Sequence, residues 1–237
     1  MIYSYTIVGV AIVLLVVLTV ISLHLRHLGH HVKQLLFGSF IVVTLAPTLF
    51  LAGSTIYINA LSTSKGPVHW HADFEIWACG QEMDLRDPTG LSNKIGTSTL
   101  HEHNDKRIHL EGVVLNSGDD SLGKFFSVIG GSLKDNILTI PVENGYTILH
   151  SGNFCIDKAY NELQFFVYKT LPSGNYFQQK ITDPSNYTIG QYGNVPPGDC
   201  IIIELDRPKE RTDRLCTSYQ AAKQTGKLKQ ELYPVNK

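Results

Sequence analysis

Two long uncharged stretches begin the chain. The first runs from Ile2 to Leu23 and the second from Leu35 to Ala60, and both consist almost wholly of apolar, aromatic, small and hydroxylated residues. Each is longer than the roughly 20 residues that a helix needs to cross the hydrocarbon of a bilayer. The pattern therefore predicts a transmembrane helical hairpin over residues 1–60, in which Pro47 is expected to kink the second helix.

The pattern changes after a short polar linker at residues 61–66. From Val68 to Trp77 apolar and polar residues alternate, which is typical of a strand with one buried face. Further apolar segments bounded by turn-forming residues predict additional strands. These segments are Gln81–Leu85, Ile108–Leu115, Ile137–Pro141, Tyr146–His150, Leu163–Thr170 and Cys200–Leu205.

Two helices are expected among these strands. Between Leu122 and Ile129 apolar residues recur with the spacing of one helical face, and two glycines follow. A second helix is predicted from Thr212 to Gln224, with Thr212 as its N-cap and Gly226 at its end. Residues 67–237 are therefore expected to form a mainly β domain of the α+β class, with one crossing helix and a C-terminal helix.

Fixed charge is scarce near the first two helices. The first 64 residues contain no Asp or Glu, and Arg26 and Lys33 are their only Lys and Arg residues. Because positive residues tend to stay cytoplasmic, the N-terminus and the C-terminal domain are expected outside. A cleaved signal peptide is disfavoured, since the first apolar run is too long and a second span follows it. The sequence thus predicts a two-pass cell-membrane protein with an extracytoplasmic domain, whose partners are the lipid bilayer and other membrane proteins.

The charge of the domain excludes several other partners. The last 173 residues carry all 21 acidic residues and 18 of the 20 Lys and Arg residues, with no block of like charge. Nucleic acid is therefore not an expected partner. Neither a GxGxxG sequence nor a P-loop occurs, so nucleotide binding has no support.

Four cysteines lie in the domain, and an even number in an oxidising compartment favours disulfides. Three connectivities are open. A bridge from Cys200, at the start of a strand, to Cys216 in the C-terminal helix would close a loop worth about 3 kcal/mol on the chain-entropy model. Cys79 and Cys155 would then form the second pair.

Histidines carry the candidate chemistry. Of the six in the domain, five fall between residues 69 and 109, and residues two apart on a strand point to the same side. Two HxH pairs and a same-face His109 and Glu111 pair would bring several imidazoles together if their strands are neighbours. The candidate metal ligands are His69, His71, His101, His103, His109 and Glu75.

Imidazole ligands with carboxylates nearby suit a transition metal ion, copper or zinc first and then iron or nickel. The set of two His, one Cys and one Met that marks blue-copper sites is not visible in this window. A solvated strand face can carry the same residue types. Three HxH or HxE pairs in one short window nevertheless favour a metal site, because they match the few-ligand geometry that metals require.

Three resemblances bear on these residues. The succession HxHADF, HxHxD, IHxxG and LGxFF, from His69 to Phe126, resembles a group of uncharacterised extracytoplasmic microbial domains. In that group the third element often reads IHxH, and in this chain Glu111 occupies the position of its last histidine. His69 to Glu75 reads HxHxxxE and resembles the first cupin motif, although the second motif is not found. A helical hairpin before an extracytoplasmic β domain is similar in layout to subunit II of haem-copper oxidases, whose dinuclear copper motif is missing.

The leading hypothesis is a membrane-tethered extracytoplasmic protein that binds copper or zinc through paired histidines. A cupin-like or hydrolytic metalloenzyme is the first alternative, with Glu75 or Glu102 as general base. A metal-free assembly subunit of a membrane complex is the second, and it predicts histidines that are exposed and dispersed. Whether the protein is an enzyme stays open.

Overall fold

The computed structural model describes residues 2–24, 27, 29–153, 155, 160–190 and 198–233. The chain divides into two compact units, Met1–Leu61 and Ser62–Lys237. Each unit is described by itself.

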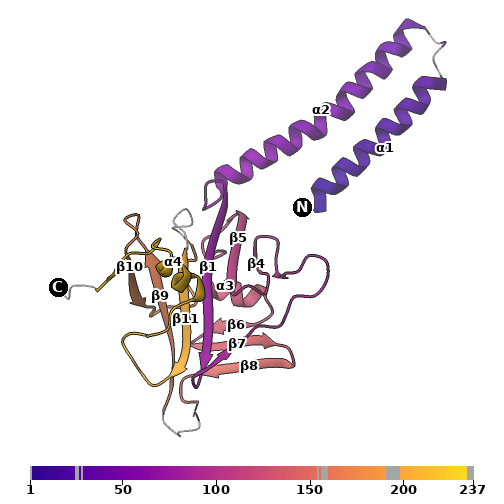
Figure 1. Ribbon diagram of the computed structural model, residues 1–237. Helices are drawn as coiled ribbons and strands as arrows, with labels where there is room; N and C mark the ends of the chain where they lie inside the picture. The colour runs from indigo at the N-terminus through magenta and orange to yellow at the C-terminus, as the bar shows by residue number, and fades with distance from the viewer. Residues whose placement is uncertain are drawn as a thin grey trace. The chain divides into compact units, whose positions relative to one another are not determined.

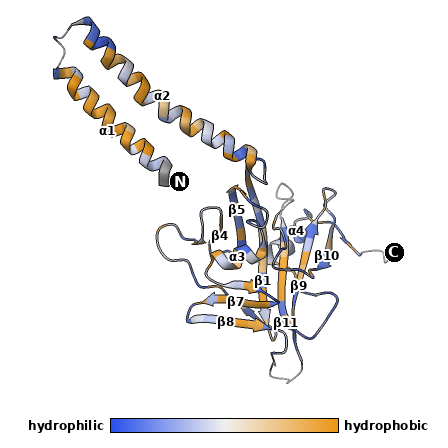
Figure 2. Ribbon diagram, turned by 180° about the vertical axis from the view of Figure 1, so that it is seen from behind, coloured by the Kyte–Doolittle hydropathy of each residue, from blue (hydrophilic) through white to orange (hydrophobic). Residues whose placement is uncertain are grey.

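The first unit is a hairpin of two helices, α1 (Ile2–His24) and α2 (His30–Leu61), which lie side by side (Figure 1). They have 23 and 32 residues, and both are long and apolar enough to cross a membrane. Apolar residues cover much of their length (Figure 2). The two predicted helices are thus confirmed; α2 continues through Pro47, and Arg26 lies outside the described residues.

Hydroxyl groups on these helices bond within the helices. Thr19, Ser39, Thr44, Thr48 and Thr55 each donate a side-chain hydrogen bond to the backbone carbonyl four residues earlier. These groups therefore need no water, which suits a helix surrounded by hydrocarbon.

The second unit is built on a mixed β-sheet. Within the described residues nine strands form it, in the order β12-β10-β9-β11-β1-β5-β4-β3 with β2 beside β1. Their bounds are β1 Pro67–Ala78, β2 Gln81–Met83, β3 Ile95–Gly96, β4 Leu100–Glu102, β5 Arg107–Val113, β9 Glu162–Thr170, β10 Tyr176–Lys180, β11 Asp199–Asp206 and β12 Glu231–Leu232. The central strands β1 and β11 run parallel, and β1 and β5 run antiparallel.

A second, smaller sheet contains β6 (Ser132–Lys134), β7 (Ile137–Val142) and β8 (Gly145–His150). Together with α3 (Leu122–Val128) it packs on one face of the main sheet, where Phe74 meets Phe125 with ring centroids 5.4 Å apart. Ser121 caps α3, since its Oγ accepts a hydrogen bond from Lys124 N at 3.1 Å. The predicted crossing helix is confirmed.

The other face of the main sheet is covered by α4 (Thr217–Gln224), whose Tyr219 is fully buried. Ile202 of β11 packs in the cluster under α4, whereas its neighbours Ile201 and Ile203 pack in the cluster under α3. Successive residues of a strand point to opposite faces. The uninterrupted apolar run in β11 therefore follows from burial on both faces.

The structure corrects the start of the C-terminal helix. α4 begins at Thr217 with Cys216 as N-cap, so the prediction of Thr212 as N-cap was wrong. The amide of Thr212 instead donates to Gln178 Oε1 at 2.9 Å, and its carbonyl accepts from Gln178 and Tyr168. The predicted end was right, since Gly226 follows the helix with a φ of 72°.

Both predicted disulfides are present, Cys79–Cys155 and Cys200–Cys216. The second joins β11 to the residue that precedes α4, so it fastens the helix to the sheet. The polar segment before β1 is also attached to the domain. Thr63 N and Ser64 N donate to the carbonyls of Leu115 and Val114, both at 3.4 Å.

Candidate metal centre

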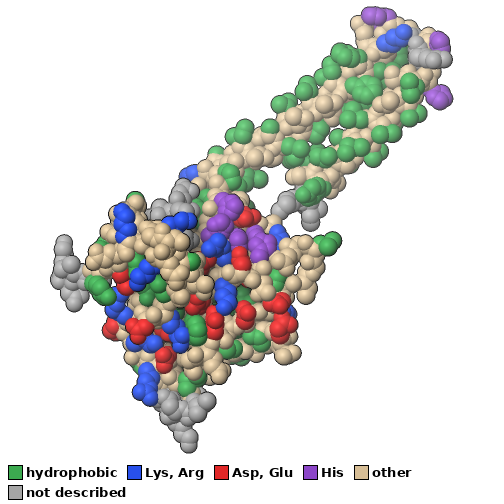
Figure 3. Space-filling model, viewed as in Figure 1, with side chains coloured by type: hydrophobic (Ala, Val, Ile, Leu, Met, Phe, Trp, Pro, Cys, Tyr) green, Lys and Arg blue, Asp and Glu red, His purple; other side chains and the backbone are tan. Residues whose placement is uncertain are grey.

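The strands β1, β5 and β4 are consecutive in the sheet and carry four of the five candidate histidines, and His103 directly follows β4. In the register of the sheet, His71 is opposite His109, and His109 is opposite His101. His69 is opposite Glu111. The imidazoles could meet only if their strands were neighbours, and β5 meets that condition because it lies between β1 and β4 and pairs with both. Histidines gather in one patch on this domain (Figure 3).

The five imidazoles form a continuous set, which we call the histidine row: His69, His71, His109, His101 and His103. Successive ring centroids along it are 4.6, 4.8, 5.4 and 4.8 Å apart. His103 also lies 4.9 Å from His109. Neighbouring strands are about 4.8 Å apart, which accounts for the two spacings across strands, His71 to His109 and His109 to His101.

Two groups within this patch have the composition and proximity of metal sites. The inner triad is His101, His103 and His109, and the outer triad is His69, His71 and Glu111. In each triad, one possible ligand atom from every member lies within 4.8 Å of the others. The sequence suggested Glu111 as the same-face partner of His109 on one strand, and the structure also places it opposite His69 of the neighbouring strand.

Hydrogen bonds outside the inner triad fix which nitrogens are free to bind a metal. His103 Nδ1 lies 2.6 Å from the carbonyl oxygen of Asn93, which can only accept, so Nε2 keeps its lone pair. His109 Nε2 lies 3.1 Å from Asp105 Oδ2, which leaves His109 Nδ1 free. Histidine ligands in metal sites commonly make such second hydrogen bonds to carboxylates and backbone carbonyls.

One nitrogen of the inner triad has no partner among the described residues. His101 is 2% exposed, and its Nδ1 atom is buried without a hydrogen bond. Leaving a buried acceptor or donor unsatisfied costs about 1–3 kcal/mol. A metal ion bound at this nitrogen would remove that cost, so the residues present fit a transition metal ion.

The electrostatics favour neutral imidazoles. Burial is the main cause that lowers the pKa of His101 to about 4, with smaller effects from positive neighbours. Burial also lowers the pKa of His71, and nearby His109 and His69 add to that effect. Both rings are therefore neutral near pH 7, which is the protonation state that ligates a metal.

The outer triad is already spaced like a coordination shell. His69 Nε2 lies 3.0 Å from His71 Nε2 and 3.3 Å from Glu111 Oε1. Bonds of about 2.0–2.1 Å in tetrahedral geometry place ligand atoms about 3.3 Å apart. Three protein ligands at this spacing leave further coordination positions open to water.

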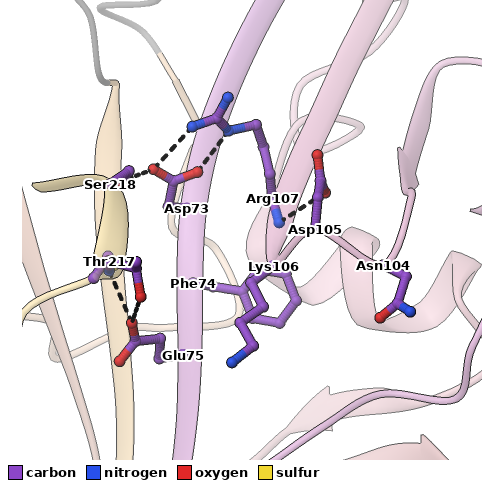
Figure 4. Close-up of a pocket in the computed structure, with 10 residues that line it drawn as sticks. Asp73, Phe74, Glu75, Asn104, Asp105, Lys106, Arg107, Thr217 and Ser218 are labelled. Carbon is purple, nitrogen blue, oxygen red and sulfur yellow. Dashed lines mark hydrogen bonds and ion pairs between the residues drawn. The ribbon is translucent and has the colours of Figure 1, made fainter. Parts of the chain in front are cut away.

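The structure places Glu75 away from both triads. Its Oε1 accepts from Thr217 N at 3.0 Å, and its Oε2 accepts from the indole of Trp77 at 3.1 Å. Four residues of strand, about 13 Å, separate it from His71. Its carboxylate thus holds the first turn of α4 (Figure 4).

Glu102 also turns away from the histidines. It lies between His101 and His103 in the sequence, so on the strand its side chain points to the opposite face. Its Oε1 accepts from Asp105 N at 2.7 Å and Lys106 N at 3.3 Å, and burial raises the pKa of its carboxyl group. Neither general-base candidate from the sequence therefore faces the triads.

A cleft of about 400 Å³ is lined by residues of β1, of the turn before β5 and of the start of α4. Arg107 donates to both oxygens of Asp73, at 2.6 and 3.2 Å, and Ser218 donates to the same carboxylate (Figure 4). Asp105 belongs to both places, because it lines the cleft and bonds His109. Sequence reasoning missed Asp105 and Asn93 as supports of the triad, although the HxHxD spacing of His101, His103 and Asp105 was a visible signal for the first.

Comparison with known proteins adds no family. No protein-family model matches this chain, and no curated protein or solved structure is significantly similar to it. The geometry of the histidine row therefore carries the functional proposal.

Proposed function

We propose that this chain is a membrane-tethered protein that binds a transition metal ion, copper or zinc, in an extracytoplasmic domain. The inner triad is the observation that carries the proposal. It joins three imidazoles, two oriented by outer hydrogen bonds and one with a buried nitrogen that lacks a partner in the described part of the chain. A merely solvated strand face would not bury His101 in this way.

The available ligands limit which metal ions the site would bind. All four cysteines are in disulfides, so no thiolate is available for a soft ion such as Cu(I). Imidazole with a carboxylate suits Zn²⁺ and Cu²⁺, and also Fe²⁺ and Ni²⁺. Metal handling is favoured over hydrolysis because Glu75 and Glu102, the candidate general bases, are engaged elsewhere.

The membrane part of the proposal rests on α1 and α2. Both have the length and composition of spanning helices, and their hydroxyl groups bond within the helices. Lys33 in the first turn of α2 favours a cytoplasmic link between them, which sends the domain outside. Two disulfides suit an oxidising compartment.

The test is the metal content of the full-length chain in detergent, after mild purification and after reconstitution with copper, zinc, iron and nickel in turn. We expect the parent to retain metal and His103→Ala to lose the ion of the inner triad. His150→Ala is the matched control, since His150 lies on β8 in the other sheet and should be dispensable. A parent chain that stays empty with all four metals would overturn the proposal.

A further inference from the structure

We infer that the histidine row holds two metal ions of unequal exchange rate: a retained ion in the inner triad and a second, exchangeable ion bound by His69, His71 and Glu111. This inference rests on the proposed function and deepens it. It assigns the outer triad as a separate binding site for a divalent cation.

One ion cannot use the whole row. His69 is on β1 and His103 follows β4, two strands away, so about 10 Å of sheet separates them. Ligand atoms on one tetrahedral ion lie only about 3.3 Å apart. The row must therefore be divided, and the two triads divide it between His71 and His109, whose ring centroids are 4.8 Å apart.

The outer triad has a geometry that hydrogen bonding alone explains poorly. His69 Nε2 faces both His71 Nε2 and Glu111 Oε1, at 3.0 and 3.3 Å. Two nitrogens that face each other need one proton between them, and the carboxylate competes for that same proton. A cation in the middle would satisfy all three lone pairs at once.

Two carboxylates offset the repulsion between neighbouring cations. Glu111 is a member of the outer triad, and Asp105 Oδ2 lies 3.1 Å from Nε2 of His109 in the inner triad. Each places a negative charge beside one of the two sites. One carboxylate thus neutralises part of the charge of the ion at each site.

The two sites differ in solvent exposure, and therefore in how fast they exchange metal. The side chains of His69 and Glu111 are 64% and 41% exposed, whereas that of His109 is 13% exposed and His101 as a whole is 2% exposed. Water reaches the outer site directly, so ligand exchange there is fast. An ion can enter at the outer triad and pass by way of His71 and His109, whose rings meet edge to face, to the inner triad, which retains it.

The test uses the full-length chain in detergent, loaded with zinc, and follows metal release to an excess of EDTA with a metal-indicator dye. We expect two equivalents of zinc in the parent, released in a fast and a slow phase. Glu111→Gln should lose the fast equivalent and keep the slow one. His103→Ala should lose the slow one, and Glu210→Gln, at an exposed glutamate beside β10, should keep both.

A second measurement tests whether the sites are adjacent. Two copper(II) equivalents in the parent should show spin–spin coupling in the electron paramagnetic resonance spectrum, and Glu111→Gln should give an uncoupled signal. A parent with one equivalent overturns the two-ion inference while leaving the proposed function intact, and a parent with none overturns both. Loss of both equivalents in a folded Glu111→Gln chain also overturns it, because the sites would then not be separate.

Discussion

His109 Nε2 lies 3.1 Å from Asp105 Oδ2, and this contact fixes the tautomer of a histidine at the centre of the row. The carboxylate accepts a hydrogen bond from Nε2–H, so Nδ1 carries the free lone pair. On the proposed function, Asp105 would act on a bound metal through His109, without binding the ion itself.

Replacing Asp105 tests that relationship. Asp105→Asn should weaken metal affinity of the inner triad about 10–100-fold, which is typical when an outer-shell carboxylate is lost. Affinity is measured by competition with a chelating indicator. Asp119→Asn is the control and should leave affinity unchanged, because the Asp119 carboxylate accepts hydrogen bonds from Asn116 and forms an ion pair with Lys124 at 3.9 Å. Equal affinity of the parent and Asp105→Asn would show that Asp105 does not orient the ligand.

The buried His101 predicts how the metal-free domain responds to acid. Burial lowers its pKa to about 4, whereas in the unfolded chain the pKa is near 6.5. Between these values the unfolded chain binds a proton that the folded chain does not, so this residue makes stability fall as pH decreases from 6.5 toward 4. Urea unfolding with EDTA present should show a smaller loss over that window in His101→Gln. An identical pH dependence in both chains would contradict the prediction.

The two disulfides should differ in how much each contributes to the free energy of unfolding. The bridged cysteines are separated by 16 and 76 residues. Loop-closure entropy then predicts losses of about 3 kcal/mol for Cys200→Ala with Cys216→Ala and about 4.5 kcal/mol for Cys79→Ala with Cys155→Ala. Urea unfolding of the two double variants measures both values. Unchanged stability in either would mean that its disulfide is not formed in the parent.

The orientation of the hairpin can be tested with reporters fused after Lys237. A reporter that is active only in the cytoplasm should be silent, and one that needs an oxidising compartment should be active. The reason is that positive residues tend to stay cytoplasmic, so Arg26 and Lys33 are expected to keep the link between the helices on that side. Strong activity of the cytoplasmic reporter would reverse the topology and remove the setting in which the disulfides form.

Much of the fold could be predicted from local patterns. The alternation in β1 reflects burial of one face, and the apolar run in β11 reflects burial of both. Apolar residues at helical spacing indicate α3, and a serine caps that helix in the structure. The strands that were missed, β3, β4, β6, β10 and β12, have two to five residues, too few for periodicity to show. The start of α4 was misplaced because Thr212 is held by tertiary hydrogen bonds that no local pattern reveals.

The residue types of the candidate site could be predicted from the sequence, but which of these residues come together could be predicted less well. The HxH spacing correctly put paired imidazoles on one face, but the register between strands decides which pairs meet. Because His69 falls opposite Glu111 and His71 opposite His109, the row splits into two triads. Glu75 lies on the same face of β1 as His69 and His71. It is further along the strand, however, and its carboxylate contacts α4 instead of the histidines.

The parallel pairing of β1 with β11 has a consequence for the order in which the domain assembles. Ala72 pairs with Asp199, so the centre of the main sheet closes only after nearly the whole chain is available. Contacts of such long sequence separation form slowly. Every residue of both triads, in contrast, lies in the segment from His69 to Glu111, whose strands pair antiparallel and are closer in sequence than β1 and β11. The strands of this segment can thus come together early, and an ion bound to the triads would brace one half of the sheet while the other half is still being made.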